Sequence, residues 1–307
     1  MRWRGRRQST NVRDVRGSGG LGGGLGGGML GGALRRGGIR RAGGGGIGTI
    51  IVILIVAWLL GINPLALLLG EGGITTGPAP QGQQTGQPAG QQAGVTDEMR
   101  DFVATVLADT EDTWSAIFTA AGEDYPEPRL TLFTGSVQSA CGQAGAATGP
   151  FYCPADRNLY IDLSFYDQLR SRFGAPGDFA QAYVLAHEVG HHVQNVLGTL
   201  DQVRSEQQRL GESQSNALQV RTELQADCFA GVWANHTQRQ GLLEEGDIDE
   251  AINAAAAVGD DALQQQSQGY VVPDSFTHGS SEQRAEWFRR GLEGGDVSNC
   301  DTFSASG

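Results

Sequence analysis

Apolar residues recur at helical spacing along most of the chain after residue 96. This periodicity predicts helices over 97–121, 165–173, 179–197, 202–210, 215–236, 248–258 and 281–292. Two segments, 129–133 and 158–163, instead alternate apolar and polar side chains as strands do, and 151–152 are a candidate partner strand. The pattern predicts a mostly helical α+β domain with a small β-sheet over residues 96–307.

Three zones of different composition precede this domain. Residues 1–46 hold ten arginines and one acidic residue among glycine tracts, which predicts a disordered tail. Residues 47–69 are uncharged and mostly aliphatic, and at about 1.5 Å per residue they can span a hydrocarbon core of roughly 30 Å as a single transmembrane helix. A buried soluble helix is the alternative. Residues 70–95, rich in glycine, glutamine and proline, predict a flexible linker.

The distribution of charge predicts how such a chain would be oriented. Arginines before the apolar stretch, and none for dozens of residues after it, predict a single-pass protein of the cell membrane with a cytoplasmic N-terminus and an extracytoplasmic domain. The long basic region favours an uncleaved anchor over a signal peptide. An RNA-binding arm is the rival interpretation of the tail, although its place beside the apolar stretch favours contact with anionic lipids. The chain from residue 70 onward holds 12 arginines and 33 acidic residues, so nucleic acid is not expected as a partner of the domain.

The candidate chemistry lies in the helix predicted over 179–197. His187, Glu188 and His191 form an H-E-x-x-H motif. Residues four apart share one face of a helix, so the two histidines can bind one zinc ion while Glu188 stands beside the open position of the metal as a general base. A pair of structural histidines is the alternative. Gly190 disfavours the helix, and its presence predicts close approach by another backbone or by a third ligand.

A catalytic zinc site needs a third protein ligand and one position for water. Glu223 is the best candidate, and Asp227 lies one turn further along the same predicted helix. Their neighbours are largely apolar, so an unpaired carboxylate there would be costly. We therefore predict Glu223 as a zinc ligand and Asp227 as the acceptor for the N–H of a ligating histidine. A solvated acidic face is the alternative.

The other three histidines are competing candidates for the third ligand. His192 is rotated about 100° from the metal face, which predicts a surface or outer-shell position. His236 ends the predicted helix of Glu223. His278 precedes a capping box, Ser280 with Gln283, that opens the last helix, and from there it can reach a cleft and stabilise an oxyanion. A loop anchor is the alternative role for His278.

Four cysteines allow three disulfide connectivities. Disulfides are reasonable in an extracytoplasmic compartment. We predict a bond between Cys141 and Cys153, which closes a short loop, and one between Cys228 and Cys300, which ties the C-terminal tail to the helix of Glu223. A zinc–thiolate site is the alternative, but none of the spacings is C-x-x-C.

Four blocks of this sequence together resemble the bacterial membrane-anchored neutral zinc metallopeptidase family. They are MRWRGRRQSTNVRD, CGQAGAATGPFYCPADRNLYIDLSFY, AHEVGHHVQNVLG, and ELQADCFAGVWA with THGSSEQRAEWFRRG. The resemblance covers nearly the whole chain apart from the glycine-rich and glutamine-rich tracts. It implies a zincin-like, more closely a gluzincin-like, fold in which His187, His191 and Glu223 bind zinc and Glu188 is the general base. The pairing of H-E-x-x-H with E-x-x-x-D is also similar to thermolysin-type proteases.

These observations predict a Zn²⁺ metallopeptidase that hydrolyses peptide bonds in a protein or peptide substrate through a metal-bound water. In zinc peptidases of this type an edge strand commonly holds the substrate backbone, and residues 160–163 or 130–133 are candidates, with plain core strands as the alternative. The rival function is a membrane-tethered zinc-containing binding or assembly factor without turnover, whose mark would be a protein side chain in the fourth zinc position. Other H-E-x-x-H metal chemistry is a third option.

Overall fold

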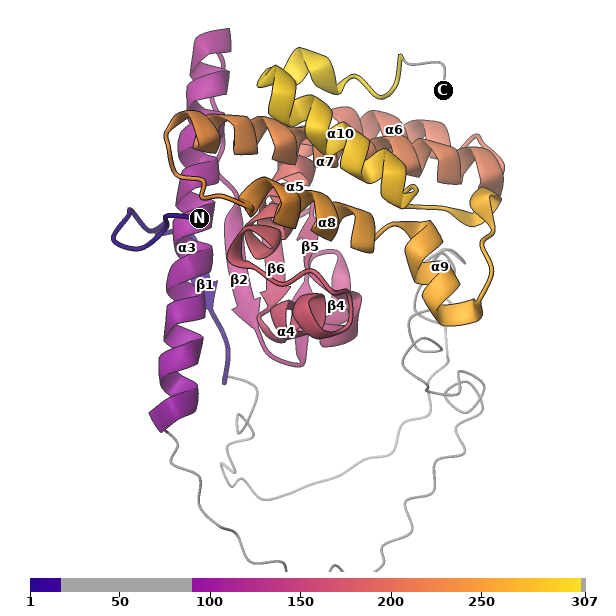
Figure 1. Ribbon diagram of the computed structural model, residues 1–307. Helices are drawn as coiled ribbons and strands as arrows, with labels where there is room; N and C mark the ends of the chain where they lie inside the picture. Colours follow the sequence, from indigo (N-terminus) through magenta and orange to yellow (C-terminus); the bar gives the residue numbers. More distant parts are fainter. Residues whose placement is uncertain (18–89, 305–307) are drawn as a thin grey trace, which may run out of the picture. The chain divides into compact units, whose positions relative to one another are not determined.

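Helices dominate the fold and a small sheet packs beside them (Figure 1). The computed structural model describes residues 1–17 and 90–304. In chain order the elements are β1 (Val12–Asp14), α3 (Gly90–Ala121), β2 (Arg129–Phe133), β3 (Ser136–Ser139), β4 (Gly142–Gly145), β5 (Phe151–Cys153), β6 (Asn158–Asp162), α4 (Ser164–Ser171), α5 (Asp178–Val196), α6 (Thr199–Gln207), α7 (Glu212–Arg239), α8 (Asp247–Ala257), α9 (Asp260–Gln268) and α10 (Ser281–Gly294), with short 3₁₀ turns at Ala146–Thr148, Pro273–Ser275 and Val297–Cys300. The predicted α+β class, mostly helical with a small sheet, is confirmed.

The main sheet has the strand order β1-β2-β6-β5. β2 pairs in parallel with β1 and with β6, and β5 is antiparallel to β6. Both β2 and β6 are therefore interior strands, and four of the five residues of each are buried. Leu130–Leu132 of β2 pair on both sides, with β1 and with β6, as expected of a core strand. In β6, Tyr160 pairs on both sides, whereas Ile161 and Asp162 pair with β2 alone, so binding of a substrate backbone by residues 160–163 stays a prediction.

The N-terminal segment, residues 1–17, is part of the folded domain. β1 pairs with β2, and Val12 lies opposite Leu130. Trp3 is buried, with its ring edge-on to Phe102 at 5.4 Å. Arg6 forms an ion pair of 2.8 Å with the buried Asp109 of α3. The prediction of disorder is wrong for this segment, because its arginines form ion pairs with carboxylates of α3 and its tryptophan packs in the core.

Residues 1–17 and the rest of the described domain form one compact unit. The predicted orientation, with the N-terminus in the cytoplasm and the domain outside it, stays a prediction. Residues 18–46, the apolar stretch 47–69 and residues 70–89 lie outside the described part of the chain. Residues 90–95, which the composition predicts as linker, instead form the first turns of α3, which begins at Gly90. Within the described ranges, no helix is both long and apolar enough to cross a membrane.

The backbones of three helices, α5, α7 and α10, are in close contact. A Cβ atom on Gly190 of α5 would lie 2.8 Å from the carbonyl oxygen of Ala226 on α7, so the predicted close approach at this glycine is confirmed. A Cβ atom on Gly291 of α10 would lie 1.9 Å from the carbonyl oxygen of Cys228. Any larger residue at either position would push the helices apart, so these two glycines set the distance at which α7 packs between α5 and α10.

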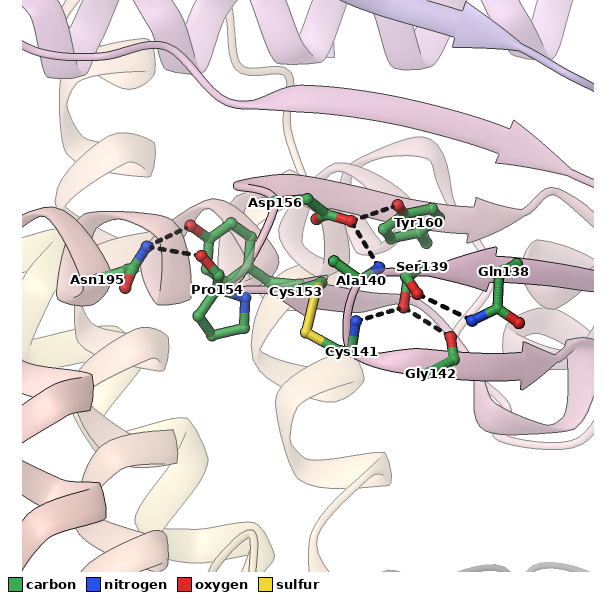
Figure 2. The surroundings of a disulfide bond; sticks show 11 residues. Gln138, Ser139, Ala140, Cys141, Gly142, Cys153, Pro154, Asp156, Tyr160 and Asn195 are labelled. Atoms are coloured by element: carbon green, nitrogen blue, oxygen red, sulfur yellow. Dashed lines mark hydrogen bonds between the residues drawn. A yellow bond between two sulfur atoms is a disulfide. The ribbon is translucent and has the colours of Figure 1, made fainter.

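Both predicted disulfides are present, Cys141–Cys153 and Cys228–Cys300. The first joins the β3–β4 hairpin to β5, as Figure 2 shows. Near it, Asn195 at the end of α5 donates hydrogen bonds to the Tyr152 hydroxyl at 2.9 Å and to the Pro154 carbonyl at 3.4 Å. The hairpin, the edge strand and the C-terminal end of α5 are thus held together.

Candidate metal centre

Three side chains from two different helices converge in the interior. His187 and His191 extend from α5 and Glu223 from α7, and their donor atoms all lie within 4.8 Å of one another. The Glu223 Oε2 atom is 3.2 Å from Nε2 of His187 and 3.4 Å from Nε2 of His191. The second Glu223 oxygen accepts a hydrogen bond from Gln219 at 2.9 Å. Two imidazole nitrogens and one carboxylate oxygen are a donor set that suits zinc.

The outer nitrogen of His187 is held by a buried ion pair. Asp227 accepts from His187 Nδ1 at 2.8 Å and from the Tyr183 hydroxyl at 2.5 Å. The Arg284 guanidinium of α10 binds both oxygens of the same carboxylate, at 2.8 and 2.9 Å. Nδ1 of His187 donates its proton in this contact, so in the neutral ring that a metal requires the lone pair is on Nε2, which faces the site. Asp227 thus lies where the sequence predicted an outer-shell acceptor.

Sequence reasoning missed Arg284. It lies on α10 one turn before Phe288, with which it shares the buried face of that helix. An arginine at such a position requires a buried partner, and this was the available signal. The partner itself could not be read from the sequence because Asp227 is 57 residues away in the chain.

The carboxylates make this site favourable for positive charge. Burial alone would lower the pKa of His187, but the carboxylates of Asp227 and Glu223 outweigh it and raise the pKa to about 9. Burial likewise opposes the shift at His191, where Glu223 raises the pKa above its usual value. Burial would raise the pKa of Glu223, yet the two histidines hold it well below its ordinary value. A cation between these groups would replace the protons that the metal-free site retains.

The predicted catalytic residues lie at different depths. Glu188 follows His187 on α5 and is buried. His278, in the loop before α10, has a half-exposed side chain whose Nδ1 lies 3.2 Å from Asp260. Asp260 also accepts from the backbone N–H groups of Thr277, His278 and Gly279, at 2.6 to 3.1 Å. Burial lowers the pKa of His278, but Asp260 and the charge of Glu223 raise it overall.

Comparison with known proteins shows the family to which this chain belongs. The sequence model of the family described as "Putative neutral zinc metallopeptidase" matches residues 1–303. The chain belongs to this family. It is 48% identical to the uncharacterized protein YpfJ of Escherichia coli strain K12 over 309 residues, which cover 100% of both chains. It is 44% identical to the uncharacterized protein Rv2575 of Mycobacterium tuberculosis strain H37Rv over 216 residues, 67% of this chain and 72% of that one. No solved structure matches.

Two of this family member's histidines lie away from the converging donors. His192 is fully buried, accepts from the Tyr152 hydroxyl at 2.9 Å on Nδ1 and donates to the Pro126 carbonyl at 2.6 Å through Nε2. Burial lowers its pKa to about 4. The prediction of a surface or outer-shell position is wrong, because α5 is covered on this side by β5 and by the loop before β2. His236 lies near Gly295, and α7 continues past it to Arg239.

The charge balance predicts proton release on zinc binding. With a pKa of about 9, His187 is protonated in the metal-free protein at pH 7.5, and a ligating imidazole must be neutral. We expect about one proton or more to leave per zinc bound, and the apparent zinc affinity to rise with pH up to about 9. Calorimetric titrations in buffers of different ionisation enthalpy measure this number. Zinc binding without proton release at pH 7.5 would contradict the electrostatics described here.

Proposed function

We propose that this protein is a zinc-dependent peptidase that hydrolyses peptide bonds in a protein or peptide substrate. The observation that carries the proposal is the convergence of His187, His191 and Glu223 with Glu188 in the next position of the same helix. This donor cluster has three members among the described residues, so one position of a tetrahedral ion is left for water. A purely structural zinc would be expected to have four protein ligands. The family description supports the same class of activity.

Each residue has a distinct part in this mechanism. A bound zinc would polarise the scissile carbonyl and acidify the attacking water. Glu188 accepts the proton of that water and delivers it to the leaving amine. Asp227, neutralised by Arg284, keeps the His187 ring oriented with Nε2 inward. His278, held by Asp260, donates to the oxyanion that forms on the carbonyl oxygen.

The proposal is tested by removing the metal. Protein stripped with a chelator should lose all cleavage of a peptide mixture, and addition of one equivalent of zinc should restore it, whereas magnesium should not because the imidazole ligands do not suit it. Retention of full cleavage by protein shown to contain no zinc would contradict a metal-activated water.

We further propose that the apolar stretch 47–69 attaches the protein to a membrane, with residues 1–17 and the domain together on one side of it. The apolar sequence supports attachment, and the pairing of β1 with β2 supports the common side.

Cysteine labelling in intact cells tests the common side. All four native cysteines are in disulfides, and Gln8 and Ser213 are exposed, so Gln8→Cys and Ser213→Cys each provide one reactive thiol. A maleimide that does not cross membranes should label both variants or neither, while both should react after lysis. Labelling of Ser213→Cys without Gln8→Cys would support the opposite-side orientation and contradict this proposal.

A further inference from the structure

A chain of two glutamine side chains leads from the metal centre to the C-terminal segment. The Gln194 Oε1 atom lies 2.9 Å from Nδ1 of His191. Gln194 Nε2 donates to the Thr222 carbonyl at 2.7 Å and to Gln225 Oε1 at 3.1 Å. Gln225 Nε2 in turn donates to the Cys300 carbonyl at 3.0 Å. Neither glutamine was singled out by the H-E-x-x-H pattern.

The two outer partners fix the direction of every hydrogen bond in this chain. A backbone carbonyl can only accept, so the Cys300 carbonyl requires the amide nitrogen of Gln225, whose oxygen then faces Gln194. The Thr222 carbonyl likewise requires the amide nitrogen of Gln194, whose oxygen then faces His191. His191 Nδ1 must therefore carry the proton, and Nε2 is left with a lone pair directed at the site. Gln194 is fully buried, so water cannot supply an alternative partner.

The outer end of the chain is fixed to the same helix that carries Gln225. Cys300 is buried and bonded to Cys228, one turn from Gln225 on α7. Thr302 donates to the Arg221 carbonyl at 2.7 Å, on the other side of Gln225. The carbonyl of Cys300 is thus held in place by one covalent and one hydrogen-bonded contact.

We propose that Gln194 and Gln225 are positioning residues for His191, and that the carbonyl of disulfide-bonded Cys300 anchors them. His187 is oriented by a buried ion pair, whereas His191 is oriented by this chain of uncharged side chains. The two imidazoles are thus held by separate sets of hydrogen-bond partners. The proposal rests on the proposed function only in taking His191 as a zinc ligand. It concerns metal affinity, which is measurable without any substrate.

The test is zinc affinity, measured by competition with a chromophoric chelator. Gln194→Leu should weaken zinc binding about tenfold or more, in the range seen when an outer-shell partner is lost, and Gln225→Leu by a smaller factor. The double variant should bind no more weakly than Gln194→Leu alone, because Gln225 acts through Gln194. Gln225→Glu keeps the size and the acceptor but cannot donate to Cys300, and it should weaken binding even if the leucine variant does not fold. Gln238→Leu, at an exposed position of the same helix, is the matched control and should bind zinc like the wild type.

Wild-type affinity in both Gln225 variants, or fully additive losses in the double variant, would overturn the proposal. The outcomes separate it from the proposed function. Variants that lose affinity in a protein without peptidase activity would support the chain and contradict the function. Normal peptide cleavage together with unchanged zinc affinity in every variant would support the proposed function and contradict the role of the glutamine chain. A wild-type protein that binds no zinc would contradict both.

Discussion

Glu223→Gln should lower zinc affinity by more than the roughly 100-fold that loss of an outer-shell partner can cost, because it removes a direct ligand and its charge. The Glu223 carboxylate lies within 3.4 Å of both histidine Nε2 atoms. The amide has nearly the same shape, so the packing of α7 against α5 should persist and the loss should fall on the metal alone. Zinc competition titrations and thermal unfolding of the metal-free protein measure the two effects separately.

Glu212→Gln is the matched control for this variant. It makes the same chemical change at an exposed position in the first turn of the same helix. It should leave zinc affinity unchanged. Equal zinc affinities of Glu223→Gln and the wild type would show that the third ligand has been assigned wrongly, and His278 would be the next candidate for it.

Arg284→Met should destabilise the metal-free protein by about 3 kcal/mol at pH 7, because removing one partner of a buried ion pair leaves the other charge uncompensated. Burial would raise the pKa of Asp227, but Arg284 and His187 lower it from 3.8 to about 2. A depressed carboxylate pKa contributes stability that is complete above about pH 4 and is lost as the pH falls towards 2. Urea unfolding at pH 7 therefore measures the full effect of the pair.

Arg289→Met is the control, since Arg289 is exposed on the same helix. It should change the free energy of unfolding by less than about 0.5 kcal/mol. If Arg284→Met were as stable as this control, the ion pair with Asp227 would not be holding α10 to α7, and the orientation of His187 would need another explanation.

The sequence predicted those parts of the site that depend on spacing within one helix. His187, Glu188 and His191 are near neighbours on α5, and the helical repeat alone brings the two histidines onto one face. Glu223 and Asp227 were found for a related reason, since two carboxylates one turn apart in an apolar helix require partners. The spacing places both carboxylates on one face of α7, and the packing of α7 against α5 then brings them to the histidine Nε2 atoms and to His187 Nδ1.

Several features that depend on contacts between distant segments were not predicted. The composition of residues 1–17 predicted disorder because no local pattern shows that Asp109 lies ready to pair with Arg6. The roles of Arg284 and of the two glutamines were missed for the same reason, because their partners are brought together only by the packing of α5, α7 and α10. The β3–β4 hairpin and α9 were missed for a different reason. Their serine, glycine and glutamine residues carry neither strand propensity nor apolar periodicity.

The most direct test of peptidase activity is cleavage of an unbiased peptide library by the zinc-loaded protein and by Glu188→Gln, with products identified by mass spectrometry. Removal of a general base typically lowers the rate about 10²- to 10⁴-fold, so we expect products from the wild type and almost none from the variant, while both bind one zinc ion. Cleavage by Glu188→Gln at the wild-type rate would contradict the assignment of Glu188. Failure of the zinc-loaded wild type to cleave any peptide would contradict the proposed peptidase activity.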